Sequence, residues 1–217
     1  VKFAPFIFIG ILLFLLIIVS PIYKKIKIIN YKKIAKFIFI YCLIFSIVWV
    51  IVANVLPMWD SWSIVNAAEY LNHNQSVDAV TQWSQGDYLQ RFPYQTPLVL
   101  VFYFCIKIAG PNSVLFFEFI NCLACAITAF LLVKYTYQLS KNNSASVLSG
   151  IFIILFLPLL LYCTFIYGDI ICLPFLVASF YLQSLALSSK KPKISYVVWS
   201  IILGIISVLL KPSMFIA

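Results

Sequence analysis

The chain has 217 residues and a formal net charge of +9, and it is 64% hydrophobic but only 10% charged. Soluble globular proteins are roughly 45–50% apolar and about 25% charged, so this composition excludes a soluble domain and indicates an integral membrane protein. The positive charge does not indicate nucleic-acid binding. Most lysines stand in short clusters between apolar runs, where they set membrane topology, and no basic stripe is interleaved with stacking aromatics.

The chain opens with an apolar stretch at about 3–22. A signal peptide has an apolar region of roughly 7–15 residues and a small-residue cleavage site, and neither feature fits here, so we predict a retained helix. The chain begins without methionine and stops at KPSMFIA while still apolar. We interpret it as the N-terminal portion of something longer.

Further stretches long enough to span a bilayer follow in order, since a spanning helix needs about 20 apolar residues. They lie at about 37–56, 113–133, 146–166, 170–187 and 195–216. The predicted fold is therefore all-α, a polytopic membrane bundle of about six transmembrane helices. We divide it into an extra N-terminal helix with a basic cytoplasmic loop, 1–34, and a core, 35–217. The external loop of this core, 57–112, should carry interfacial helices.

The apolar segment 98–110 decides the topology. As a helix it rises only about 20 Å against a hydrocarbon core of roughly 30 Å, so we predict that it lies in the interface. Three lysine clusters then share one side, which should be cytoplasmic: 24–36, 134–141 and 190–193. The opposite side collects Asp60, Glu69, Asp78, Asp87, Arg91, Asp169 and Lys211. If the segment crosses instead, Asp169 moves to the cytoplasmic side, away from Asp60.

Two acids on the predicted outer side are the candidate catalytic residues. Asp60, in PMWDSW, lies beside Trp59 and Trp62 at the expected headgroup level. Either Asp60 or Ser61 is expected to cap an amphipathic helix, and the alternative role of Asp60 is a carboxylate that accepts a proton from a hydroxyl. Asp169, in YGDI, is either a loop residue of a helix hairpin turned by Gly168 or a second carboxylate of the same site.

Two cations on that side suit a phosphate. Lys211 follows the last span, where its ammonium either reaches the headgroups or pairs with a phosphate. Arg91, in RFPYQTP, offers a two-pronged guanidinium or is simply solvated. Within the third span, Glu118 and Asn121 are three residues apart on one helical face, so we expect both to face the bundle interior and to hydrogen-bond between helices.

Other chemistry finds little support in the sequence. The six cysteines lie in or beside apolar runs and are interpreted as small hydrophobes. Cys122 and Cys125 spell CxxC, but no second CxxC or histidine stands near, which argues against a metal site there. His73 is the single histidine, and GxGxxG, P-loop and GxSxG motifs are absent from the sequence.

The order of these features resembles the N-terminal half of bacterial GT-C membrane glycosyltransferases, the family 39-like group related to protein mannosyltransferases and aminoarabinose transferases. The matching stretches are MWDSWSIVNAAEYL, RFPYQTPLVLVFYFCIKIAG, FEFINCL, YGDI and LLKPSMFIA, within roughly 37–217. The resemblance implies a hexosyltransferase-like enzyme of the bacterial cytoplasmic membrane, active on its outer side. Such an enzyme moves a sugar from a polyprenyl-phosphate carrier to an extracytoplasmic glycan, lipid or protein acceptor, with inversion at the anomeric carbon.

The resemblance also implies roles for individual residues. Asp60 matches the first-loop acid that serves as general base or metal-site carboxylate, and Asp169 matches the second external acid. Lys211 and Arg91 match more loosely the cationic positions near the lipid phosphate. The remaining residues assigned to substrate or phosphate binding are Tyr94 and Gln95.

The sequence departs from this family in two ways. Many relatives have an adjacent acidic pair in the first loop, whereas Asp60 is followed by Ser61. This difference leaves open whether Asp60 and Asp169 hold a divalent metal. The relatives are also longer, so this chain alone is expected to lack their later spans and can be inactive by itself.

Two other functions stay open. A transporter or flippase of lipid-linked sugars, in which the acids line a path, predicts internal repeats or helices broken near the midplane. The sequence shows only scattered prolines such as Pro158 and Pro174. A truncated, noncatalytic membrane protein would keep the fold without the chemistry.

Overall fold

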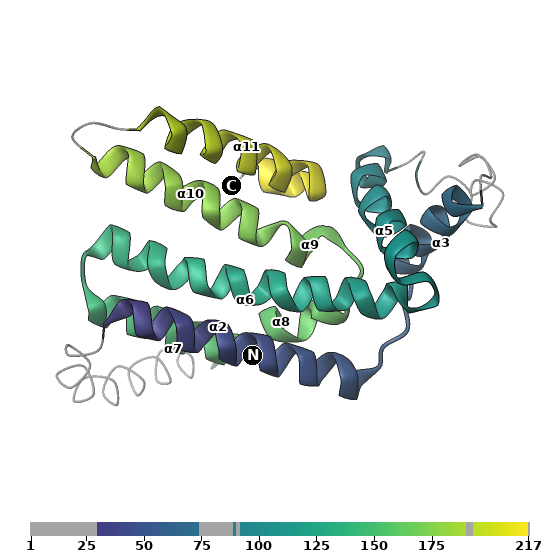
Figure 1. The fold of residues 1–217 in the computed structure, drawn as a ribbon, viewed down its shortest axis with the longest axis horizontal. Helices are drawn as coiled ribbons and strands as arrows, with labels where there is room; N and C mark the ends of the chain where they lie inside the picture. The colour runs from purple at the N-terminus through teal and green to yellow at the C-terminus, as the bar shows by residue number, and fades with distance from the viewer. Residues whose placement is uncertain (1–29, 74–88, 90–91, 190–192, 217) are drawn as a thin grey trace, which may run out of the picture.

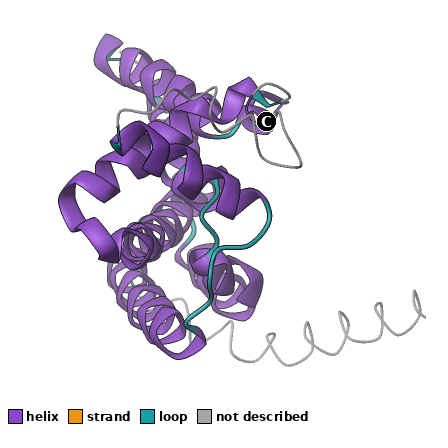
Figure 2. Ribbon diagram, turned by 90° about the vertical axis from the view of Figure 1, so that its right-hand side faces the viewer, coloured by secondary structure: helices purple, strands orange, loops and turns teal. Residues whose placement is uncertain are grey.

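The computed structural model describes residues 30–73, 89, 92–189 and 193–216. Within these residues all regular elements are helices, which confirms the all-α prediction (Figures 1 and 2). The first helices are α2 (Tyr31–Ala53), α3 (Asp60–Asn72), η2 (Pro93–Gln95), α5 (Thr96–Ala109), η3 (Gly110–Asn112) and α6 (Ser113–Ser140). They are followed by α7 (Asn143–Leu155), α8 (Leu157–Leu161), η4 (Tyr162–Thr164), α9 (Gly168–Ile171), α10 (Leu173–Ser188), α11 (Ile194–Leu210) and η5 (Pro212–Ile216).

The long helix α6 is the centre of the bundle. It packs against α2, α7 and α10, and its first turns meet α5 (Figure 1). Its buried surface is rich in small residues, among them Ala124, Ala126 and Ala129, which let neighbouring helices approach closely. The facing side of α2 buries residues at helical spacing, namely Ala35, Ile38, Cys42, Ser46 and Val50.

The helices α3 and α5 lie together at one end of the bundle, which we call the α3–α5 end (Figure 1). Figure 2 views the molecule from this side, with the long helices nearly end-on. The two helices bury apolar faces in one cluster, to which α6, α9 and the end of α11 also contribute. The predicted segment 98–110 is thus a helix, α5, packed on α3 rather than alongside the long helices. Its position in the membrane stays a prediction.

Five of the six predicted spans fall on described residues, and fewer than five helices there are long and apolar enough to cross a membrane. Three helical stretches are long and apolar enough to cross a membrane: Tyr31–Ala53, Pro93–Ser140 and Gly168–Ser188. There is a fourth span if α7 and the α8–η4 stretch cross the membrane together. The axes of these two segments differ by 59° at the break between them. The α11 helix is shorter, with 17 residues, and the predicted span 3–22 lies outside the described residues.

Prolines account for both shortened spans. Pro158 lies in the first turn of α8, and proline lacks the N–H and carries a ring that clashes with the carbonyl four residues earlier, so α7 and α8 do not join. Pro212 follows Lys211, and the residue before a proline is disfavoured in helical conformation. Lys211 accordingly has extended backbone angles and α11 ends at Leu210.

Most described lysines lie at the end opposite α3 and α5, and Lys107 and Lys211 are the exceptions. The start of α2 meets the end of α6, where the rings of Tyr31 and Tyr137 stack with centroids 3.7 Å apart. The end of α6 meets the end of α10, where Gln138 donates to Ser188 over 2.6 Å. This end carries Lys32, Lys33, Lys36, Lys134, Lys141 and Lys193. The position of these six lysines matches the predicted lysine-rich side, while the orientation of the two ends in a membrane stays a prediction.

Candidate functional site

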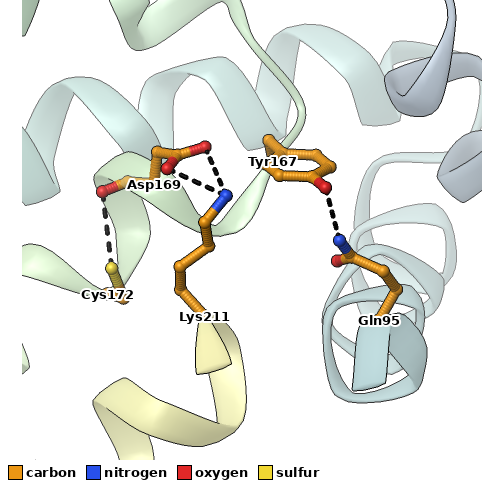
Figure 3. Close-up of polar contacts among 5 residues, drawn as sticks. All are labelled: Gln95, Tyr167, Asp169, Cys172 and Lys211. Carbon is orange, nitrogen blue, oxygen red and sulfur yellow. Dashed lines mark hydrogen bonds and ion pairs between the residues drawn. The ribbon is translucent and has the colours of Figure 1, made fainter. Parts of the chain in front are cut away.

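An ion pair between α9 and the end of α11 forms the centre of the candidate site. Lys211 Nζ lies 3.0 Å from Asp169 Oδ1 and donates a hydrogen bond of 3.0 Å to Oδ2 (Figure 3). The side chains are 19% exposed for Lys211 and 39% exposed for Asp169. The Lys211 side chain is therefore mostly covered by protein, while the Asp169 side chain is partly open.

Close backbone contact brings the two charged residues together. A Cβ atom on Gly168 would overlap the carbonyl oxygen of Leu210, so only glycine allows α9 to approach the end of α11 this closely. Ser207 Oγ adds a hydrogen bond of 3.2 Å to the carbonyl oxygen of Cys172. Because Gly168 and Leu210 each precede a member of the ion pair, their contact sets the distance between Asp169 and Lys211.

An aromatic ring and a buried amide complete the site. Lys211 Nζ lies 4.1 Å from the ring centroid of Tyr167, a distance typical of a cation–π contact. The hydroxyl of Tyr167 accepts a hydrogen bond of 2.6 Å from Gln95 Nε2 (Figure 3). Gln95 is only 2% exposed and comes from η2, the turn that leads into α5. We call Gln95, Tyr167, Asp169 and Lys211 the ion-pair site.

The site unites three predicted residues from distant parts of the chain, Gln95, Asp169 and Lys211. Sequence reasoning missed Tyr167, although it stands two residues before Asp169 in the YGDI motif. The signal that could have found it is the pairing of an aromatic ring with a cation at a membrane surface. Tyr94 is 46% exposed, and its ring packs edge-on against Phe92.

Asp60 lies elsewhere at the α3–α5 end. It is the first residue of α3 and is exposed between two exposed tryptophans, Trp59 and Trp62. The predicted helix is confirmed, but the predicted cap is wrong, since Trp59 holds the cap position with a φ of 52° and no side-chain cap bond. Among the described residues, no hydrogen bond or ion pair joins Asp60 to Asp169. Arg91 lies outside the described residues.

Glu118 and Asn121 are both buried in α6, as expected. Asn121 Nδ2 donates to the carbonyl oxygens of Cys163 at 3.2 Å and Phe165 at 2.8 Å, which ties α6 to the segment before α9. Glu118 is 4% exposed, and its Oε1 has no hydrogen-bond partner among the described residues. The expected hydrogen bonding between elements is thus found for Asn121 and not for Glu118 Oε1.

The site does not fit a divalent cation. The described residues contain no group of three or more His, Cys, Asp or Glu side chains that could hold a metal ion. Both carboxylate oxygens of Asp169 already face the ammonium of Lys211. A divalent cation would have to displace that ammonium and would find a cation, rather than further oxygen ligands, beside it.

An anion that binds Lys211 would have to compete with Asp169 for the ammonium. A charge beside a largely buried side chain attracts an opposite charge more strongly than one in bulk water, because the local dielectric constant is lower. A phosphate oxygen can replace a carboxylate oxygen at the same donor. The exchange would leave Asp169 free to accept a proton or another hydrogen bond.

Protein-family models, curated proteins and solved structures yield no match to this chain. The residues of the ion-pair site and their surroundings are therefore the basis for assigning a function.

Proposed function

We propose that this chain is part of an integral membrane glycosyltransferase. It would move a sugar from a polyprenyl-phosphate carrier to an extracytoplasmic glycan, lipid or protein acceptor, with inversion, in the bacterial cytoplasmic membrane. The observation that carries the proposal is the ion pair of the largely buried Lys211 side chain with Asp169 at one end of an apolar helical bundle. Such a cation can receive the phosphate of a donor whose chain stays in the hydrocarbon.

The surroundings of Lys211 suit a lipid-borne phosphate. Leu209 is 53% exposed and Phe165 is 49% exposed, so apolar surface lies close to Lys211 in sequence and to the site. In a membrane such side chains face lipid rather than water. A polyprenyl phosphate could thus reach the ammonium without leaving the bilayer.

The two acids have different roles in this proposal. Asp169 holds the ammonium until the donor phosphate takes its place. Asp60 is exposed and has no ion pair with a described residue, so its carboxylate is available as the general base. It would take the proton of the acceptor hydroxyl while that oxygen attacks the anomeric carbon. The bond from this carbon to the phosphate oxygen breaks, and Lys211 meets the charge that the leaving phosphate gains.

Transfer assays on the complete protein in membranes test these roles. A general base typically contributes about 10²–10⁴ in rate, so Asp60→Asn should lower sugar transfer by that factor while donor binding stays intact. Lys211→Gln should weaken binding of polyprenyl phosphate. The matched control is Lys107→Gln, since Lys107 is an exposed lysine of α5 at the same end and lies outside the ion-pair site.

Near-normal transfer by Asp60→Asn would remove the base role. Equal donor binding by the Lys211→Gln and Lys107→Gln variants would remove the phosphate role. Both results together would overturn the transferase proposal for these residues.

One observation favours a transporter or flippase of lipid-linked sugars as the second candidate. The α7–α8 break, bent by 59°, is the kind of interrupted span that transporters place near their binding sites. Proteoliposomes without an acceptor separate the two functions. Movement of a lipid-linked sugar between leaflets, with no glycosylated product when acceptor is added, would favour transport.

A further inference from the structure

Two buried oxygens one turn apart on α6 lack partners. Glu118 Oε1 and Asn121 Oδ1 are fully shielded from solvent and have no hydrogen-bond partner among the described residues. The side chains are 4% and 0% exposed. Residues three apart share a helical face, where side-chain pairs of this length can hydrogen-bond.

The orientation of the Asn121 amide is fixed by its other contacts. Its nitrogen faces two carbonyl oxygens, those of Cys163 and Phe165. The opposite orientation would place an oxygen against both carbonyls, so the nitrogen must point there. Asn121 Oδ1 therefore points away from these carbonyls as an unused acceptor.

The surroundings of Glu118 disfavour an ionised carboxylate. No described lysine or arginine forms an ion pair with it, and the titratable groups that face it are the thiols of Cys122 and Cys163. An isolated charge in the interior of a membrane bundle is costly, and such acids pair with a cation or stay neutral. A neutral carboxyl also gains a donor, which an ionised one lacks.

We propose that Glu118 is held as a neutral carboxylic acid whose O–H donates to Asn121 Oδ1. One proton then satisfies both unpartnered oxygens. Glu118 is a positioning residue in this arrangement, because it acts through Asn121.

The consequence reaches the ion-pair site. Asn121 anchors the carbonyl of Phe165, and the chain continues through Ile166 to Tyr167 and Asp169. These last two residues contact Lys211. Glu118 therefore helps to fix the segment that carries half of the site, and this role holds whether the site binds a sugar donor or another anion.

Infrared spectra of the purified full chain, compared between the wild type and its variants, test the proposal. At neutral pH, the wild-type protein should show the C=O stretching band of a protonated carboxylic acid, and Glu118→Gln should lose it. Asn121→Leu should shift the band, because the acid loses its acceptor. Glu69→Gln is the matched control, since Glu69 is an exposed acid of α3 and its replacement should leave the band unchanged.

Thermal unfolding supplies a second readout. Glu118→Gln keeps a neutral donor and should retain the wild-type unfolding temperature, whereas Glu118→Ala should unfold at a lower one. A protonated-acid band that survives in Glu118→Gln would overturn the proposal. The lack of this band in the wild-type protein would also overturn it, because it would indicate an ionised carboxylate. The same conclusion would follow if sodium raised the unfolding temperature of the wild type but not that of Glu118→Gln.

Discussion

A Cβ atom added at Gly168 should disrupt the ion pair between Asp169 and Lys211. A Cβ there would overlap Leu210 O and lie 3.1 Å from Leu210 C and 3.3 Å from Lys211 Cβ. Because two of these atoms are backbone, Gly168→Ala should push α9 away from α11 and lower stability by about 1–3 kcal/mol, the usual cost of overpacking. Thermal unfolding in detergent measures the loss.

The matched control for this prediction is Gly204→Ala in α11. A Cβ at Gly204 would meet Ser179 Oγ at 3.4 Å, which is an ordinary contact, so its effect should be small. Equal unfolding temperatures for the two variants would show that the close approach of Gly168 to Leu210 is not needed.

The sequence predicts the kinds of residues in the site but not their contacts. Lys211 and Asp169 are 42 residues apart, and charge patterning only indicates that both lie on one side of the membrane. Their contact depends on the approach of Gly168 to Leu210, which is a tertiary feature. The cap of α3 differs from the prediction for a related reason, since a local preference for Asp at a cap does not decide where packing makes the helix begin.

At the scale of the helices, Pro158 interrupts the α7–α8 pair, and hydrogen bonds from other elements stabilise the interruption. Trp49 Nε1, from α2, donates to the carbonyl of Leu161 over 3.1 Å at the end of α8. Trp49→Phe removes this hydrogen bond and should lower the free energy of unfolding by about 0.5–1.5 kcal/mol. Chemical or thermal unfolding followed by circular dichroism measures the change.

Trp199→Phe in α11 serves as the control for Trp49→Phe. Trp199 is 56% exposed, and no hydrogen bond to a described residue is recorded for its indole. The two variants should differ, and equal stability would show that the Trp49 contact does not support the end of α8.

Helix existence was predictable from apolar length, whereas helix continuity was not. The stretch 146–166 is long and apolar enough to suggest one span, but Pro158 divides it and the broken end is completed by Trp49 and Asn121. Those two donors come from α2 and α6, far away in sequence. A sequence pattern contains the proline but not the partners that stabilise the break.

For the whole molecule, the distribution of apolar surface supports the membrane assignment. Large hydrophobic side chains are exposed along several long helices, for example Ile51 at 62%, Leu187 at 87% and Ile201 at 56%. Six of the described lysines lie instead at one end, and the acids Asp60 and Asp169 lie at the other together with Lys107 and Lys211. A soluble monomer rarely exposes so much apolar surface, but a helical bundle in lipid does.

Cysteine labelling determines which end faces the cytoplasm and whether α5 crosses. All six native cysteines are buried, so background reaction should be low. A membrane-impermeant maleimide should label His73→Cys in intact cells, and Ser140→Cys only after permeabilisation, because the lysine-rich end is expected inside.

Lys33→Cys is the control and should behave like Ser140→Cys, since stacked Tyr31 and Tyr137 place both residues at one end. Labelling of His73→Cys and Ser140→Cys from the same side would show that α5 spans the bilayer.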